Sequence, residues 1–181
     1  MRRILLIAAL CLLAAASTGC KKAQLRRQLK ELMGSTIVLP EKITCVYNGD
    51  VYPMPDSLRD KAKLIMYIDS TECTACRISH LWEYQDVFEY SAKSGRFEVM
   101  IVLSNMVFDS IPLVRYLADR DLDYPVYVDM ERRFLVENPH IPQEKLFHSF
   151  LLDSGGQVIF VGDPALSERM LKALGLALDK L

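Results

Sequence analysis

Three stretches of the chain are apolar at almost every position and rich in β-branched and aromatic residues. Such runs are typical of strands that are buried on both faces of a sheet. They are residues 63–69, 97–104 and 124–129. Near the C-terminus, apolar runs at 147–153 and 157–161 flank Ser-Gly-Gly and predict a β-hairpin. Residues 37–40 and 43–47 predict a short strand and a hairpin arm, because Asn48-Gly49 follows them as a turn signal.

Other segments carry apolar residues at helical spacing. These are residues 74–92, 109–120, 130–137 and 165–180. The first places Ile78, Leu81, Trp82 and Phe88 on one face and ends near Gly95. The second tolerates Pro112 in its first turn. Strands that alternate with helices, then a hairpin and a final helix, predict an α/β protein with a central mixed sheet flanked by helices.

The first twenty residues have the pattern of an export signal. Arg2 and Arg3 precede an apolar run at 4–16, which is short for a membrane span, and Ser-Thr-Gly-Cys follows it. The last four residues resemble a bacterial lipobox, which implies that Cys20 is acylated and becomes the N-terminus. The alternative is an ordinary signal peptide. We therefore expect a signal peptide at 1–19, a lipidated basic helical tether at 20–35, and a domain at 36–181.

Charge limits the classes of partner. Removal of Arg2 and Arg3 leaves 20 basic against 23 acidic residues, a net charge of −3. No broad basic surface suggests nucleic acid. The basic segment 21–30 favours contact with anionic headgroups, although a solvated spacer explains it nearly as well. Lys21-Lys22 lacks the acidic residue that often retains lipoproteins at the inner membrane, which favours the outer membrane, facing the periplasm.

The cysteines carry the candidate chemistry. Cys11 lies in the signal and Cys20 at its end, which leaves Cys45, Cys73 and Cys76. The last two form a C-x-x-C pair, which can become a disulfide in an oxidising compartment. A zinc site would usually need a second such pair, and a purely structural bridge over so short a loop gains little. A redox pair is the favoured interpretation.

The order of elements around this pair resembles the thioredoxin fold, over roughly residues 37–180. The stretch Phe-Leu-Leu-Asp-Ser-Gly-Gly-Gln-Val at 150–158 is similar to the hairpin of membrane-tethered TlpA/redoxin-type proteins, which carry an N-terminal strand extension. The resemblance implies a thiol–disulfide oxidoreductase without cofactor or metal. Its partners would be exported proteins with thiols or disulfides, and an inner-membrane electron donor would recharge it.

A dithiol catalyst needs one thiol that ionises near neutral pH and a second that resolves the mixed disulfide. A thiol at a helix start faces free backbone N–H groups, which lower its pKa from about 8.5 to roughly 3.5–7.5. Cys73 is therefore the expected attacking thiolate and Cys76 the resolving thiol. Glu72 should raise the Cys73 pKa, and Arg77 could lower it.

The chain departs from the resemblance at three places, and the first is Glu72, where relatives usually carry an aromatic residue. The usual buried acid maps onto Tyr67 or Ser79, and neither is acidic. The usual cis-proline before the hairpin maps onto His148, or onto Phe147 if the hairpin is one residue longer. His148 could then be a proton shuttle or charge partner for Cys73, a metal ligand, or a histidine whose ring points to solvent.

Several readings stay open at this stage. Cys45 is expected to be a small buried hydrophobe, with a reactive or resolving thiol as the lesser alternative. Trp82 is expected in the core, and His80 on the surface. The rivals to an oxidoreductase are a thiol peroxidase, and a non-catalytic thioredoxin-like module that binds a metal or a partner at Cys73, Cys76 and His148.

Overall fold

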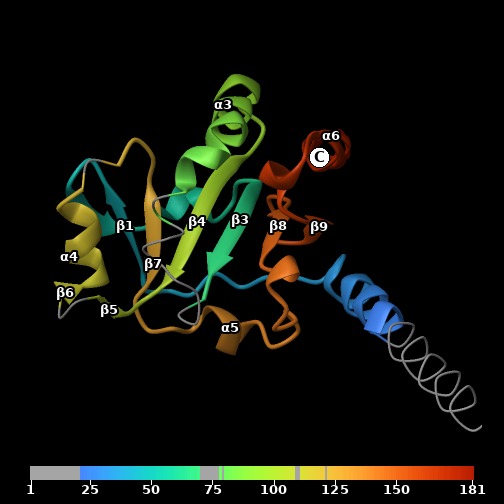
Figure 1. The fold of residues 1–181 in the computed structure, drawn as a ribbon, viewed down its shortest axis with the longest axis horizontal. Coiled ribbons are helices and arrows are strands. Elements are labelled where there is room, and N and C mark those ends of the chain that lie inside the picture. The colour runs from blue at the N-terminus through green and yellow to red at the C-terminus, as the bar shows by residue number, and fades with distance from the viewer. Residues whose placement is uncertain (1–20, 70–77, 79, 109–110, 121) are drawn as a thin grey trace, which may run out of the picture.

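A mixed β-sheet lies at the centre of the computed structural model, which describes residues 21–69, 78, 80–108, 111–120 and 122–181. Its strand order is β2-β1-β7-β4-β3-β8-β9 (Figure 1). The strands are β1 (Ile43–Tyr47), β2 (Asp50–Pro53), β3 (Lys63–Ile68), β4 (Glu98–Ser104), β7 (Val126–Asp129), β8 (Ser149–Leu152) and β9 (Val158–Val161). Strands β3, β4 and β7 are parallel to one another, whereas β1 and β8 pair antiparallel to them. The predicted mixed α/β sheet and its buried strands are confirmed.

The two faces of the sheet support two separate clusters of buried side chains. Along β3, Leu64, Met66 and Ile68 belong to one cluster. Ile65 and Tyr67 point the other way into the second cluster. Because successive side chains of a strand alternate between faces, a strand with both faces covered must be apolar throughout. This explains why the central strands read as continuous apolar runs.

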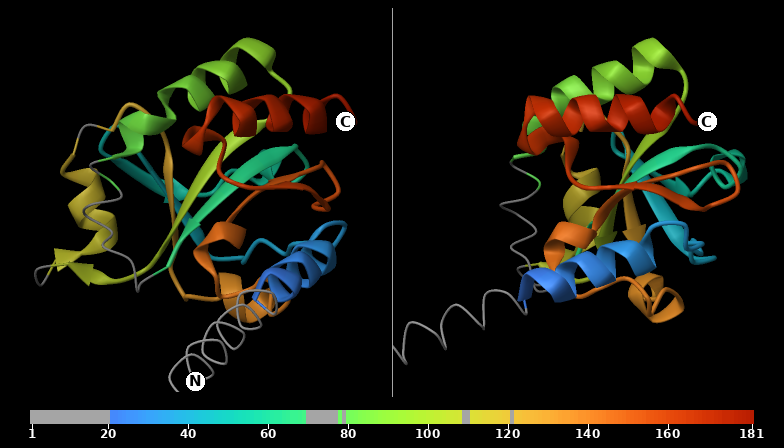
Figure 2. Two further views of the ribbon diagram at one scale, coloured as in Figure 1. Left: turned by 45° about the vertical axis from the view of Figure 1, so that its right-hand side comes forward. Right: turned by 90° about the vertical axis from the view of Figure 1, so that its right-hand side faces the viewer.

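Helices cover both faces (Figure 2). The first face carries η2 (Leu81–Tyr84), α3 (Gln85–Ser94), α4 (Leu113–Ala118) and α6 (Glu168–Leu178). The second carries the helix at residues 21–32, α5 (Phe134–Glu137) and η3 (Lys145–Phe147). Short 3-10 turns η1 (Asp56–Leu58) and η4 (Pro164–Leu166) lie between elements. None of the described helices is long and apolar enough to cross a membrane.

Both predicted hairpins are present. Asn48 and Gly49 have φ of 49° and 79°, the left-handed pair that a two-residue type I′ turn between β1 and β2 requires. This hairpin is the predicted N-terminal strand extension and forms one edge of the sheet. Gly95 ends α3 with φ of 61°, as its position in the sequence predicts.

Four local predictions are wrong. Residues 37–40 do not form a strand; Ile37 N–H instead donates to the Gly156 carbonyl beside an isolated bridge. The predicted helix over 109–120 is shorter, because Pro112 has ψ of 137°, pairs in a small β5–β6 ladder and precedes the first helical residue. That ladder joins β5 (Val107–Phe108) to β6 (Ile111–Pro112).

The segment 74–92 is also not one continuous helix. Its described part is helical at Ile78, turns at His80, continues as the 3-10 turn η2 and then becomes α3. In a 3-10 turn, residues three apart share a face, so Leu81 and Tyr84 are buried together. Trp82 is consequently directed outward and is 66% exposed, which contradicts its predicted place in the core.

The helix at residues 21–32 is attached to the domain at its C-terminal end. Leu32 is fully buried in the second cluster. The Gln28 side chain donates to the Glu144 carboxylate at 3.0 Å. After the helix, Gly34 N–H donates to the Val158 carbonyl at 2.8 Å. The predicted boundary near residue 35 stays a prediction, but the helix that precedes it contributes to the core.

Candidate functional site

The two C-x-x-C cysteines, Cys73 and Cys76, lie outside the described residues, as does Cys20, so their assigned roles stay predictions. The described chain leaves β3 at Ile68 in the middle of the sheet and resumes at Ile78. A cavity of about 570 Å³ borders this place. It is lined by Tyr67 of β3, two residues before the described chain stops at Asp69, and by Tyr84 of η2, six residues after it resumes at Ile78. The candidate site is therefore this cavity at the carboxyl end of β3.

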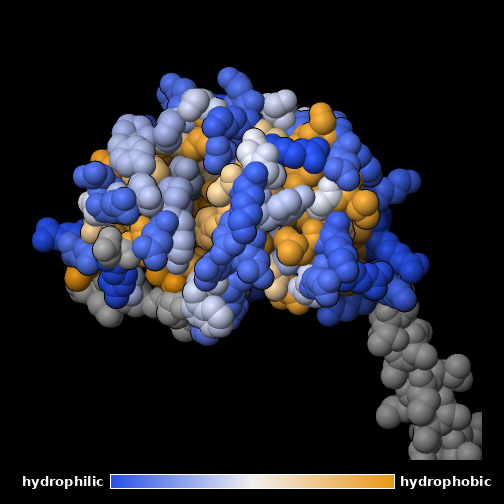
Figure 3. Space-filling view, turned by 90° about the horizontal axis from the view of Figure 1, so that it is seen from above, coloured by the Kyte–Doolittle hydropathy of each residue, from blue (hydrophilic) through white to orange (hydrophobic). Residues whose placement is uncertain are grey.

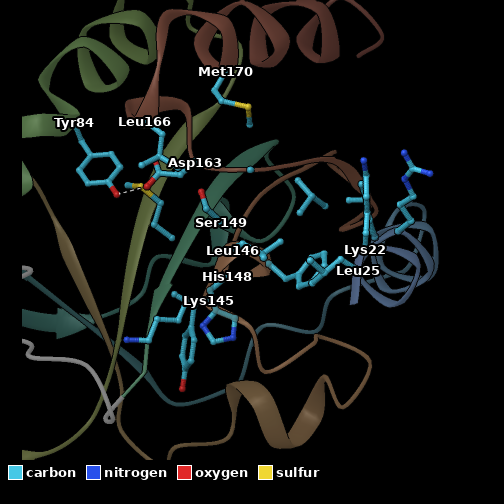
Figure 4. Close-up of a pocket in the computed structure, with 17 residues that line it drawn as sticks. Lys22, Leu25, Tyr84, Lys145, Leu146, His148, Ser149, Asp163, Leu166 and Met170 are labelled. Carbon is cyan, nitrogen blue, oxygen red and sulfur yellow. Dashed lines mark hydrogen bonds between the residues drawn. The ribbon is translucent and has the colours of Figure 1, made fainter. Parts of the chain in front are cut away.

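Four parts of the chain form the walls of the cavity (Figure 4). The N-terminal helix contributes one wall, and η3 with His148 and Ser149 contributes a second. The end of β9 with η4 and α6 forms a third, and Met66, Tyr67 and Tyr84 close the inner side. The other lining residues are Lys22, Leu25, Arg26, Leu29, Lys145, Leu146, Phe147, Val161, Gly162, Asp163, Leu166 and Met170. Most of this lining is apolar.

His148 stands directly before β8, where the resemblance placed a cis-proline. Its residue surface is 5% exposed, so the interpretation with a solvent-facing ring is wrong. Its backbone N–H donates to the Lys145 carbonyl at 3.0 Å, and its carbonyl accepts from Tyr67 N–H at 2.8 Å. No peptide bond in the described ranges is cis. His148 thus takes the place of the proline on an ordinary trans backbone.

The ring of His148 is also oriented by its surroundings. Its Nε2 lies 3.2 Å from the Pro142 carbonyl oxygen. Because a carbonyl can only accept, this bond requires a proton on Nε2 and leaves Nδ1 as the basic nitrogen of the neutral ring. The edge of the ring meets Tyr67 with centroids 5.8 Å apart. The ring is therefore held in one orientation at the wall of the cavity, and the proton-shuttle role of His148 stays a prediction.

Tyr67 occupies the position at which relatives were expected to carry a buried acid. It is stacked on Phe134 with ring centroids 4.7 Å apart. Burial raises the pKa of Tyr67 to about 12, although a hydrogen bond with Ser104 opposes the shift. Its hydroxyl therefore stays neutral at physiological pH, and it cannot supply the negative charge of a buried carboxylate.

Asp129 helps to hold Phe134 in its position against Tyr67. It was not identified from the sequence as a candidate residue. It is completely buried at the end of β7. Its carboxylate accepts from the backbone N–H groups of Arg133 at 3.0 Å and Phe134 at 2.8 Å. These bonds fix the start of α5 and so hold Phe134 against Tyr67. The sequence did contain a signal for this role, because Asp129 stands at the end of a predicted buried strand and before a predicted helix.

A second hydrogen bond missed by sequence reasoning joins two walls of the cavity. Tyr84 of η2 donates its hydroxyl proton to Asp163 at 2.6 Å (Figure 4). The same carboxyl group accepts from Ala165 N–H at 3.0 Å and caps η4. The dipeptide Asp163-Pro164 is typical of a helix start, but its partner lies 79 residues away in sequence.

Cys45 does not belong to this site. It lies on β1, which is separated from β3 by two strands, a distance of about 14 Å across the sheet. The thiol is buried, and burial raises its pKa despite hydrogen bonds with Tyr52 and Tyr127. The predicted role as a small buried residue agrees with this position. His80 is on the surface, as expected, 3.0 Å from Glu83.

Metal binding finds no support in the described part of the chain, where no three His, Cys, Asp or Glu side chains lie close enough to hold an ion. Because both C-x-x-C cysteines fall outside that part, the proposed metal alternative at Cys73, Cys76 and His148 is not tested by this observation.

Comparison with known proteins defines the class of fold. No family model and no curated protein matches the chain. A candidate thiol-disulfide oxidoreductase from Bacteroides vulgatus is 16% identical with a TM-score of 0.54, covering 82% of this chain and 98% of its own. A candidate thiol:disulfide interchange protein DsbE from Chlorobium tepidum is 21% identical with a TM-score of 0.50, covering 81% and 99%. Enterococcus faecalis AhpC is 14% identical with a TM-score of 0.52, covering 81% and 92%.

These structures show that the chain has a thioredoxin-like fold. The likeness spans about four fifths of the chain and nearly all of each of the three structures. At this level of identity it establishes the arrangement of strands and helices and not the chemistry. The chemistry has to be inferred from the C-x-x-C pair and from the cavity beside it.

Proposed function

We propose that the protein is a lipid-anchored thiol–disulfide oxidoreductase of the cell envelope. The observation that supports the proposal is the position of the C-x-x-C pair in the sequence of a chain with a thioredoxin-like fold. Cys73 and Cys76 lie in the sequence between β3 and η2, and Tyr67 of β3 and Tyr84 of η2 both line the cavity. Two of the similar structures are described as thiol–disulfide oxidoreductases or interchange proteins, which supports the same chemistry here.

The reaction is an exchange of one disulfide for another. The Cys73 thiolate attacks a sulfur of the client disulfide, forms a mixed disulfide and releases one client thiolate, which takes a proton. The Cys76 thiolate then attacks the Cys73 sulfur, forms the Cys73–Cys76 disulfide and releases the second client thiol. Two electrons pass to the client. A second dithiol protein, acting as the electron donor, must reduce the Cys73–Cys76 disulfide by the same two steps.

His148 is the described group best placed to serve this exchange. It lines the cavity, and the Nε2 bond to the Pro142 carbonyl leaves Nδ1 as its basic nitrogen. A neutral imidazole beside the pair can take the proton of an attacking thiol and return it to a departing thiolate. Because Tyr67 remains neutral, the histidine replaces the buried acid as the proton carrier.

The proposed location follows from the N-terminal pattern. An acylated Cys20 would place the domain at the periplasmic face of a membrane, with the outer membrane favoured by Lys21 and Lys22. The clients would be exported proteins with thiols or disulfides, and the donor an inner-membrane protein. Incorporation of radiolabelled palmitate that is lost in Cys20→Ala is the expected result. Equal labelling of the wild-type chain and of Cys20→Ala would contradict the proposal that Cys20 carries a lipid anchor.

A redox titration of the full chain, purified in detergent, tests the catalytic proposal. We expect one two-electron couple between about −120 and −300 mV. It should disappear in Cys73→Ser and in Cys76→Ser, whereas Cys45→Ala is the matched control and should retain it. Cys76→Ser should also trap a mixed disulfide with the client.

Two results would overturn the proposal. The first is the absence of any dithiol–disulfide couple in the wild-type chain. The second is a couple that survives in Cys73→Ser and is lost in Cys45→Ala. Stoichiometric metal that depends on Cys73 and His148, without a couple, would replace the enzyme with a binding module.

A further inference from the structure

The N-terminal helix forms one wall of the cavity at the carboxyl end of β3. Lys22, Leu25, Arg26 and Leu29 all line the cavity. Their spacing of three and four residues places them on a single helix face. Figure 4 shows Lys22 and Leu25 projecting from this helix. A segment that the sequence predicts to be a tether therefore contributes side chains to the candidate site.

This wall is fixed to the domain by a second face of the same helix. Leu32 is buried in the core, and Gln28 is bonded to Glu144, which directly precedes η3. Leu25 packs against the same core cluster and lines the cavity as well. The helix thus holds its cavity face in a defined position relative to His148 and η3.

The surface around the cavity is apolar. Leu29, Leu146 and Leu166 are 39%, 55% and 77% exposed, although all three line it. Figure 3 shows hydrophobic surface among polar side chains on the half of the molecule that carries β8, β9, α6 and the N-terminal helix. Exposed leucines around a concave site are suited to an apolar side chain of a bound segment.

The charges around the cavity are mainly positive. Among the described residues, the basic side chains that line it are Lys22, Arg26 and Lys145, and the carboxylate that lines it is Asp163. Asp163 is already bonded to the Tyr84 hydroxyl and to the Ala165 N–H. In the described part of the chain, neither Lys22 nor Arg26 has an ion-pair partner within 4.0 Å. A bound segment with acidic residues would complement this charge.

We infer that the N-terminal helix is a specificity-determining wall of the client groove. It selects client segments in which an apolar residue adjoins the reacting cysteine and acidic residues flank it. Leu25 and Leu29 contact the apolar residue, and Lys22 and Arg26 attract the acidic ones. This inference rests on the proposed function, because it specifies the class of protein substrate that the same cysteine pair would accept.

Two peptide disulfides test the inference on the full chain in detergent. Both contain the same Leu-Cys centre, and one is flanked by two aspartates, the other by two lysines. We expect the wild-type chain to reduce the acidic peptide about 3- to 10-fold faster in kcat/KM, as two partly exposed charge pairs allow. Uncharged 2-hydroxyethyl disulfide measures the reactivity of the dithiol without the groove.

A pair of charge-matched variants isolates the wall. Lys22→Glu with Arg26→Glu should remove or reverse the peptide preference. Arg27→Glu with Lys30→Glu makes the same change in net charge on residues of the same helix that do not line the cavity, and it should leave the preference intact. Arg27→Glu with Lys30→Glu should also reduce 2-hydroxyethyl disulfide at the wild-type rate and retain the wild-type Tm. For Lys22→Glu with Arg26→Glu the readout is the ratio of the two peptide rates, because a general loss of dithiol reactivity lowers both rates equally and leaves that ratio unchanged.

The failures of the two proposals are distinguishable. If the wild-type chain does not react with 2-hydroxyethyl disulfide, the oxidoreductase proposal fails. If it reacts but shows no peptide preference, or if both double variants lose the preference equally, the specificity wall is refuted. A further outcome would also overturn the inference. If the Cys20→Ser chain floats with phosphatidylglycerol vesicles, if this flotation requires Lys22 and Arg26, and if there is no peptide preference, then this face is a membrane contact.

Discussion

Shortening one buried side chain of the N-terminal helix tests whether that helix belongs to the folded domain. Leu32 is 0% exposed and packs in the second core cluster. Replacing a fully buried leucine by alanine costs about 2–5 kcal/mol, through lost burial and the cavity left behind. For Leu32→Ala we expect a free energy of unfolding lower by about 3 kcal/mol. For a domain of this size, that loss lowers Tm by about 6–12 °C.

Leu29→Ala is the matched control, because it makes the same chemical change on the same helix at a position that is 39% exposed. Its expected cost is about 1 kcal/mol, since only part of the side chain leaves contact with the protein. Urea unfolding of the full chain, followed by far-UV circular dichroism, measures both free energies at a common m-value. If Leu32→Ala loses no more stability than Leu29→Ala, the helix is not packed on the domain, and the wall of the groove does not exist.

Two other substitutions probe the site and the core. His148→Pro removes the backbone bond to Lys145 and disfavours the helical conformation of Phe147, so urea unfolding should show a loss of about 2–4 kcal/mol. A fully stable proline variant would contradict this account, and His148→Ala separates the side-chain contribution. Burial lowers the pKa of Lys63 from 10.5, so the unfolded chain binds more protons than the folded one between the two pKa values. The free energy of unfolding of the wild type, relative to that of Lys63→Met, should therefore rise as the pH approaches 10.5. If this difference stays flat or falls, burial does not lower the pKa of Lys63.

The sheet could be predicted because its central strands are covered on both faces. A strand with two buried faces must be apolar throughout, which leaves a direct record in the sequence of β3 and β4. Residues 37–40 could not be predicted in this way. There the Asn138 side chain bonds both backbone groups of Val38 at 2.8 Å and replaces a neighbouring strand. A side-chain amide 100 residues away leaves no local pattern.

For the candidate site, the sequence could predict only the features that depend on residues close together in the chain. The place of His148 before the hairpin follows from counting back from Ser-Gly-Gly, and the structure confirms that it directly precedes β8. The surrounding cavity depends on contacts between distant segments. Tyr84 meets Asp163, and Gln28 meets Glu144 from 116 residues away. Because these pairs follow from how helices pack on the finished sheet, sequence spacing alone does not reveal them.

The packed N-terminal helix also sets how far the protein can reach. The described part of this helix, residues 21–32, is twelve residues or about 18 Å long, and residue 21 directly follows the proposed lipidated Cys20 in sequence. If Cys20 is acylated as proposed, a helix whose last turn is held in the core leaves only a short connection between the lipid anchor and the groove. A domain attached in this way could not reach clients far from the membrane. It would process cysteines that are presented within a few nanometres of the bilayer, in clients that are themselves passing through or resting at that surface.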